Sequence, residues 1–220
     1  MVRGLSAREI KAIDHFTINS IGIPSVVLME RAALSVTEAV LSEYDDNENF
    51  IVVCGTGNNG GDGVAIARLL HQSGKRVTLH VIGDLSKASE ETHIQLIIAR
   101  HLEMTISESD ADLSEQKPAI IIDALFGIGL DRAVKDPYLS VIKAINQSTA
   151  TILAVDIPSG LSADTGIVYN EAVRAKKTYT IGFWKKGFDN DQCRPFTGEI
   201  KTLAIGYPEA KFYQHLLESE

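Results

Sequence analysis

Short apolar runs alternate with amphipathic stretches along the middle of the chain. Runs that fit β-strands cover residues 50–54, 76–82, 119–123, 151–156 and 178–181. Helical patterns fill the gaps at residues 64–72, 86–101 and 138–147. Strands that are apolar on both faces and alternate with helices are typical of a mainly parallel sheet covered by helices on both sides. The pattern therefore predicts an α/β fold, to which residues 199–205 could add an edge strand.

Two helices are predicted before the first strand. The segment from Ser6 to Glu9 fits a capping box, which opens a helix that runs to about Thr17. A second helix begins after Pro24, and its charged pair at positions 30 and 31 is expected to face solvent. Its apolar positions suit packing against a sheet, and they are Val27, Leu28, Ala32, Leu34, Val36 and Val40.

Composition limits the class of protein and its surroundings. A chain of 220 residues can build one sizeable core, so we expect a single domain over residues 1–220. The net charge of -8 argues against bulk nucleic-acid binding and against binding to an anionic membrane surface. No segment approaches about 18 uninterrupted apolar residues, and nothing near the N-terminus fits a signal peptide. Since Cys54 and Cys193 form neither a disulfide framework nor a metal-ligand spacing, we expect a reducing, cytoplasmic location.

A glycine-rich turn follows the first predicted strand. Gly55, Gly57 and Gly60 fit G-x-G-x-x-G between a strand and a helix, where backbone amides and the helix dipole favour a phosphate. The same turn carries two asparagines and Asp62, which a purely backbone phosphate site does not need. An aspartate beside a phosphate repels it unless a cation, a hydroxyl or a sugar lies between them.

Two further aspartates directly follow the apolar residues 120–122 and 152–155 of two predicted strands. Asp123 and Asp156 are expected at the carboxyl edge of the sheet, where α/β proteins bind ligands. A lone aspartate there is more often a turn or helix cap, but two of them beside the asparagine-rich turn favour a ligand site. Oxygen donors from Asn59, Asp123 and Ser159 suit a hard alkali or alkaline-earth cation.

Other charged residues leave alternatives open. Arg132, Lys185 and Lys186 could contact a phosphate, although solvated surface positions are at least as common for such side chains. A nicotinamide-dependent dehydrogenase would place an acidic residue after the second predicted strand, where only Asp84 is available, slightly late. The histidines have no serine or cysteine partner in a recognisable nucleophile elbow, so hydrolase chemistry receives little support.

Three motifs in order carry a resemblance to a known family. They are residues 57–63 (GNNGGDG), 123–130 (DALFGIGL) and 155–160 (VDIPSG). Together they resemble the NAD(P)H-hydrate epimerase family, the YjeF N-terminal domain, over essentially the whole chain, including residues 28–32 (LMERA). The family's fused dehydratase domain has no room in 220 residues, so the free-standing form is expected.

The resemblance implies a three-layer α/β/α Rossmann-like fold that interconverts the R and S forms of the C6-hydrated cofactors NADHX and NADPHX. It implies one potassium ion per subunit, held by Asn59, Asp123 and Ser159, and a homodimer or larger homo-oligomer. We assign Asp156 the catalytic role. The substrate-binding residues carried over are Asn58, Asn59, Gly60, Gly61, Asp62, Gly127, Ile128, Gly129, Leu130, Asp131, Arg132, Ala133 and Asp156.

A different class of function remains as an alternative. The same domain resembles one that serves as a non-catalytic, dimerising scaffold in messenger-RNA decapping proteins. Such scaffolds commonly lose the site residues, whereas every carboxylate and asparagine named above is present in this chain. The acidic net charge also argues against an RNA-binding surface.

Overall fold

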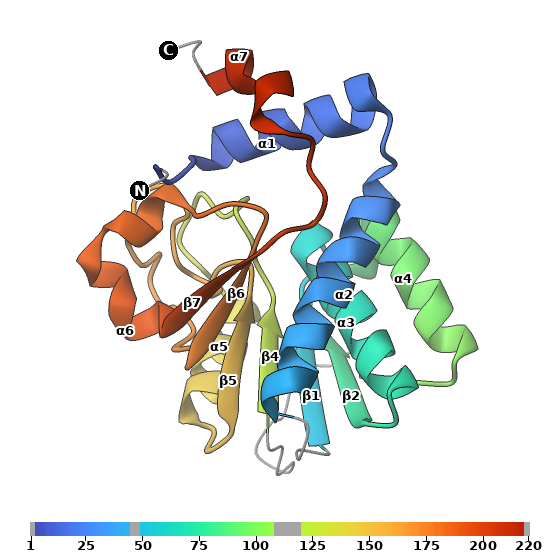
Figure 1. Cartoon of the computed structure of the whole chain (residues 1–220). Helices are drawn as coiled ribbons and strands as arrows, with labels where there is room; N and C mark the ends of the chain where they lie inside the picture. The colour runs from blue at the N-terminus through green and yellow to red at the C-terminus, as the bar shows by residue number, and fades with distance from the viewer. Residues whose placement is uncertain (1–2, 45–48, 108–119, 218–220) are drawn as a thin grey trace.

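A seven-stranded parallel sheet forms the centre of the molecule (Figure 1). The computed structural model describes residues 3–44, 49–107 and 120–217. Neighbouring strands follow the order β3-β2-β1-β4-β5-β6-β7, and every pairing between them is parallel. The strands are β1 (Asn49–Cys54), β2 (Arg76–Val81), β3 (Thr105–Ser107), β4 (Ile120–Ala124), β5 (Thr151–Val155), β6 (Lys177–Ile181) and β7 (Glu199–Leu203). The predicted α/β fold is confirmed, and the strand order reverses between β1 and β4.

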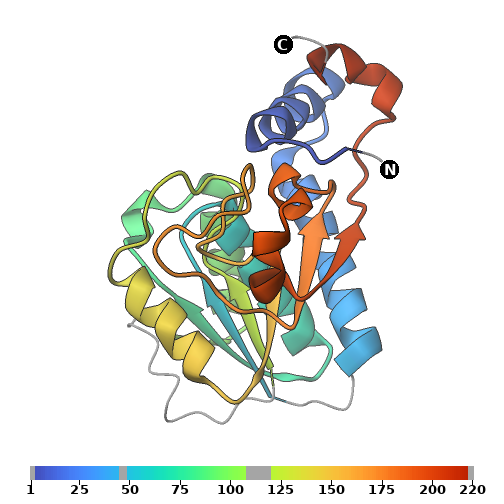
Figure 2. The same ribbon diagram turned by 90° about the vertical axis from the view of Figure 1, so that its left-hand side faces the viewer.

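Helices cover both faces of the sheet (Figures 1 and 2). One face packs against α2, α3 and α4, and the opposite face packs against α5. Helix α1 and the short α7 lie beyond the carboxyl ends of the strands. The helices are α1 (Ala7–Phe16), α2 (Ser25–Tyr44), α3 (Asn58–Gln72), α4 (Glu90–His101), α5 (Tyr138–Gln147), α6 (Arg194–Thr197) and α7 (Gln214–Leu217).

The N-terminal predictions hold in part. Ser6 caps α1 in a complete capping box with Glu9, as predicted. Helix α2 follows Pro24 as expected, but Val27 and Leu34 are 43% and 40% exposed, so their assignment to the buried face was wrong. Arg31 is exposed as expected, whereas the neighbouring Glu30 forms an ion pair with Arg68 of α3.

Two helix boundaries also differ from the prediction. Helix α3 begins at Asn58 rather than at residue 64, so most of the glycine-rich segment is helical. The predicted helix over 86–101 is interrupted, because Ser89 caps α4 by accepting a hydrogen bond from the Thr92 amide. A separate 3₁₀ turn, Leu85–Lys87, precedes it and is capped by Asp84. The strand prediction was correct apart from β3, which the pattern missed.

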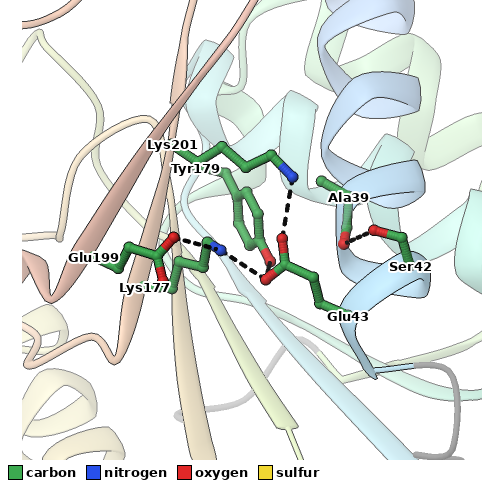
Figure 3. Close-up of polar contacts among 7 residues, drawn as sticks. All are labelled: Ala39, Ser42, Glu43, Lys177, Tyr179, Glu199 and Lys201. Carbon is green, nitrogen blue, oxygen red and sulfur yellow. Dashed lines mark hydrogen bonds and ion pairs between the residues drawn. The ribbon is translucent and has the colours of Figure 1, made fainter.

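A charged cluster fastens the C-terminal turn of α2 to the outer strands (Figure 3). Glu43 accepts hydrogen bonds from Lys177 Nζ at 2.7 Å, Lys201 Nζ at 3.1 Å and Tyr179 Oη at 3.2 Å. Lys177 also pairs with Glu199 at 3.0 Å. Burial raises the pKa of Glu43, but the two lysine contacts outweigh it and hold that pKa below its ordinary value.

We expect Glu43→Gln to lower the free energy of unfolding by about 1–2 kcal/mol at neutral pH, because Lys177 loses a charged partner while it stays mostly buried. A lowered folded-state pKa contributes stability above the unfolded pKa and loses it as pH falls. The difference between wild type and variant should therefore shrink below about pH 4. Urea unfolding at several pH values measures it, with the exposed Glu38→Gln as the matched control. A constant difference across pH would contradict this account.

Candidate active site

A cleft of about 1090 Å³ opens at the carboxyl edge of the sheet. It lies where the strand order reverses, which is the usual ligand site of open α/β sheets. Its walls come from α1, α2, the start of α3, the loops after β4 and β5, and the segments after β6 and β7. The predicted site residues that line it are Asn58, Asn59, Asp62, Gly127, Ile128, Gly129, Leu130, Asp131, Arg132, Ala133 and Asp156.

The glycine-rich segment brings the start of α3 against the sheet. A Cβ at Gly60 would overlap the carbonyl oxygen of Gly55, and a Cβ at Gly61 would lie 2.5 Å from Met29 Cε. Both glycines are buried and lie outside the cleft wall, although they were assigned to substrate binding. The absence of side chains there permits close packing, which leaves Asn59 and Asp62 at the cleft wall.

Asn59 carries an unsatisfied amide. Its Oδ1 and Nδ2 atoms are both buried, and neither has a hydrogen-bond partner among the described residues. Buried polar groups are nearly always hydrogen-bonded, since a missing partner costs about 1–3 kcal/mol. An amide left in this state next to a cleft is a candidate contact for a ligand or an ion.

Asp123 and Ser159 lie together beneath the cleft. The Ser159 hydroxyl donates to Asp123 Oδ1 at 2.6 Å, its amide donates to Oδ2 at 2.8 Å, and the Leu125 amide donates to Oδ1 at 3.2 Å. Ser159 Oγ accepts from the Phe126 amide at 2.9 Å. Burial raises the pKa of Asp123 to about 6 even though these hydrogen bonds favour the carboxylate.

The donor set fits a hard cation. A carboxylate has about four acceptor positions and a hydroxyl has two. After the contacts above, one acceptor position remains on Asp123 Oδ2 and one on Ser159 Oγ, in addition to the unused Oδ1 of Asn59. No three His, Cys, Asp or Glu side chains group as a metal site in residues 3–44, 49–107 and 120–217, so an ion at this place would be held by one carboxylate together with hydroxyl and amide oxygens. Carboxylate, hydroxyl and amide oxygens match alkali and alkaline-earth ions.

The loop after β4 lies beside both Asn59 and Asp156. A Cβ at Gly127 would lie 3.1 Å from Asn59 Cβ and 3.4 Å from Asp156 Oδ2, so this glycine separates the two polar side chains. Residues 131–133 are exposed on the cleft rim. The loop therefore joins the predicted cation ligands to the predicted catalytic carboxylate.

Asp156 has an unusual backbone and a charged partner. Its φ of 67° lies in the left-handed region, which only a few per cent of non-glycine residues adopt and which occurs often at functional sites. Its Oδ1 accepts hydrogen bonds from Lys185 Nζ and, at 3.1 Å, from the Ile181 amide. Lys185 is only 1% exposed, so of the two alternatives left open for this lysine, the solvated surface position is excluded.

Two further polar residues were missed in the sequence. Asp14 of α1 and Tyr207, beyond β7, both line the cleft, and the Tyr207 hydroxyl donates to Asp14 Oδ1. Burial raises the pKa of Asp14, and burial also raises that of Asp62 well above its ordinary value, with added repulsion from the Asp156 and Asp14 carboxylates. The cleft therefore groups three aspartates around one buried lysine.

Fold and site define a Rossmann-like α/β protein with a polar ligand cleft at its switch point. The model of the family described as YjeF-related protein N-terminus matches residues 25–187. The chain belongs to this family, which confirms the resemblance seen in the sequence.

Similar proteins cover nearly the whole chain. A Limosilactobacillus fermentum protein named NAD(P)H-hydrate epimerase is 44% identical over 198 residues, which is 90% of this chain and 94% of that protein. A Lentilactobacillus buchneri protein of the same name is 42% identical over 207 residues, covering 94% and 95%. A yeast crystal structure shares the fold, with a TM-score of 0.79 at 20% identity over 92% of this chain and 88% of that one. In the described part of the chain, the helices are too short or too polar to span a membrane.

Proposed function

We propose that this chain is an NAD(P)H-hydrate epimerase, an isomerase that interconverts the R and S epimers of NADHX and NADPHX. Relatives with this name match it over most of both chains. The observation that carries the proposal at the site is the Asp156 carboxylate, with one oxygen anchored and Oδ2 beside Gly127 at the cleft. Nothing among the relatives favours the non-catalytic scaffold.

Inversion at C6 needs one bond of that carbon to break and form again. When the C6–O bond breaks, a proton passes to the hydroxyl oxygen, water leaves, and the N1 lone pair stabilises an iminium. Water then adds to the opposite face and gives its proton to a carboxylate. When the C6–N1 bond breaks instead, a carboxylate takes the hydroxyl proton as C6=O forms, and the electron pair of the broken bond stays on N1, conjugated with the ring C2=C3 and the carboxamide. N1 then attacks the other face of C6=O, and the carboxylic acid returns the proton to the oxygen. Either route needs a carboxyl group within reach of the oxygen on C6.

Asp156 is our assignment for that group. Its Oδ1 is occupied by Lys185 and the Ile181 amide, so Oδ2 is the oxygen that can exchange a proton with substrate. The start of α3 and the exposed rim at residues 131–133 would hold the pyrophosphate and ribose groups. The cleft is large enough for a dinucleotide, since ligand pockets typically measure about 300–1000 Å³.

We also propose a potassium ion held by Asn59, Asp123 and Ser159. The unused acceptor positions on these residues support it. Such an ion would supply positive charge that offsets the repulsion between the aspartates and a bound phosphate. The protein's contribution is the pre-formed Asp123–Ser159 pair and the buried Asn59 amide.

Potassium should therefore stabilise the folded protein. We expect the melting temperature to rise by a few degrees in KCl relative to NaCl at equal ionic strength. Free potassium at ten times its dissociation constant raises the free energy of unfolding by about 1.4 kcal/mol. Asn59→Ala should abolish the difference between the two salts, whereas Asn58→Ala should keep it. Differential scanning calorimetry measures both. An equal response to potassium in wild type and Asn59→Ala would rule out this ligand set.

We propose a cytoplasmic location and a homodimer or larger homo-oligomer for this chain. Both cysteines are buried and free, which suits a reducing compartment. Ile94, Ile97 and Ile98 of α4 and Leu102 at its C-cap are 36% to 44% exposed at helical spacing, and such an apolar stripe supports self-association. Light scattering on the purified protein measures the mass.

The function is tested on purified R-hydrate. The epimer ratio, followed by chromatography, should change faster with the protein than in a heat-denatured control. A dehydrogenase would instead bind intact NADH tightly and turn over a second substrate. A scaffold would leave the spontaneous rate unchanged.

A further inference from the structure

Lys185 is a buried cation at the base of the cleft. Its ammonium group donates to Asp156 Oδ1 and, at 2.8 Å, to the Ile181 carbonyl. An ammonium group has three N–H donors, so these two contacts leave one donor. A lysine that is 1% exposed pays a large desolvation cost, which is tolerated only when the charge is paired and hydrogen-bonded.

The backbone of Lys185 is held by the N-terminal segment. The Leu5 amide donates to the Trp184 carbonyl at 2.9 Å, and the Lys186 amide donates to the Leu5 carbonyl at 2.8 Å. The two segments form a parallel bridge between Leu5 and Lys185. The Lys185 carbonyl accepts from the Phe188 amide at 3.0 Å. Lys185 is thus anchored on both sides before any ligand binds.

The other charged groups at this end of the cleft are mostly acidic. Asp14 comes from α1 and Asp62 from α3, and both carboxylates interact electrostatically with Lys185. Tyr207 is bonded to Asp14, and Lys11 of α1 also lines the cleft. In this acidic setting Asp156 is, among the described residues, the aspartate that forms an ion pair with Lys185.

We propose that Lys185 is the positioning residue of the active site: it fixes the Asp156 carboxylate through Oδ1 and so directs Oδ2 to the oxygen on C6 of the substrate. This inference rests on the epimerase function. Lys185 lies outside the three sequence motifs. It affects turnover by holding Asp156 and does not itself transfer a proton.

Removing the charge separates this role from a structural one. Lys185→Met should lower kcat at least tenfold with little change in KM, and the acidic limb of its pH profile should move up by about one unit or more, because Asp156 loses an opposite charge. Lys186→Met is the matched control, since that neighbouring side chain is exposed and outside the cleft wall. It should keep the wild-type rate and profile.

A second pair of variants keeps the test decisive if Lys185→Met folds poorly. Asp156→Asn/Lys185→Met removes both partners, which is expected to restore folding, and it should be no slower than Asp156→Asn alone. Lys185→Ala should regain activity with added ethylammonium but not with tetramethylammonium, which lacks N–H donors. If the wild type is active and Lys185→Met keeps the wild-type kcat and pH profile, the inference is overturned. It is also overturned if the rate losses of the two single substitutions add up in the double variant. An inactive wild type would instead overturn the proposed function.

Discussion

Replacing Asp156 with asparagine is expected to slow epimerisation by about 10²–10⁴-fold, since a positioned acid–base group typically contributes that much. Asparagine is isosteric with aspartate and tolerates the left-handed backbone at this position, where φ is 67°. Its amide oxygen can still accept the hydrogen bond from Lys185. The variant should therefore fold normally and bind substrate, while it lacks a group that accepts a proton.

The control for this variant is Asp191→Asn. Asp191 is exposed, forms a surface pair with Arg194, and lies outside the cleft wall. Single-turnover rates on R-hydrate, together with circular dichroism of each variant, make the comparison. A wild-type rate in Asp156→Asn would show that another group exchanges the proton.

Replacing Gly60 with alanine should be among the most damaging single changes for folding. The added methyl group would overlap the Gly55 carbonyl oxygen, which is backbone and cannot rotate away as a side chain could. We expect the free energy of unfolding to fall by about 3 kcal/mol or more, or the protein to be insoluble, because overpacking forces the start of α3 away from the sheet.

Gly57→Ala is the matched control from the same turn. Nothing lies within 4 Å of a Cβ at Gly57, and its φ of -86° suits any residue. Its cost should stay within about 1 kcal/mol, mostly from the weaker N-cap. Urea denaturation compares the two variants. An equal loss of unfolding free energy in Gly60→Ala and Gly57→Ala would show that Gly60 is not required for close packing.

The fold was largely predictable because buried parallel strands are continuous apolar runs. The runs that became β1, β4 and β5 were recognised on this basis. Asp123, near the end of β4, and Asp156, just after β5, lie at the carboxyl edge as predicted. Strand β3 was missed because it has three residues and none is fully buried. The early start of α3 was missed because glycine and asparagine disfavour helices, and tertiary packing overrides that preference.

The site residues predicted from the sequence lie in the segments that follow β1, β4 and β5. Lys185 stands beyond a turn after β6, and its burial results from the bridge to Leu5 at the other end of the chain. Asp14 and Tyr207 meet because α1 packs against the C-terminal segment, where Ile13 and Tyr213 share one apolar cluster. Contacts between such distant segments leave no local pattern in the sequence.

The most direct test of the account follows the approach to equilibrium from both sides. Pure R-hydrate and pure S-hydrate are incubated separately with the protein, in potassium and in sodium, and the epimer ratio is followed by chromatography. The account predicts that both reactions reach the same final ratio as the spontaneous reaction, and much faster. No acceleration from either epimer in either salt would contradict it.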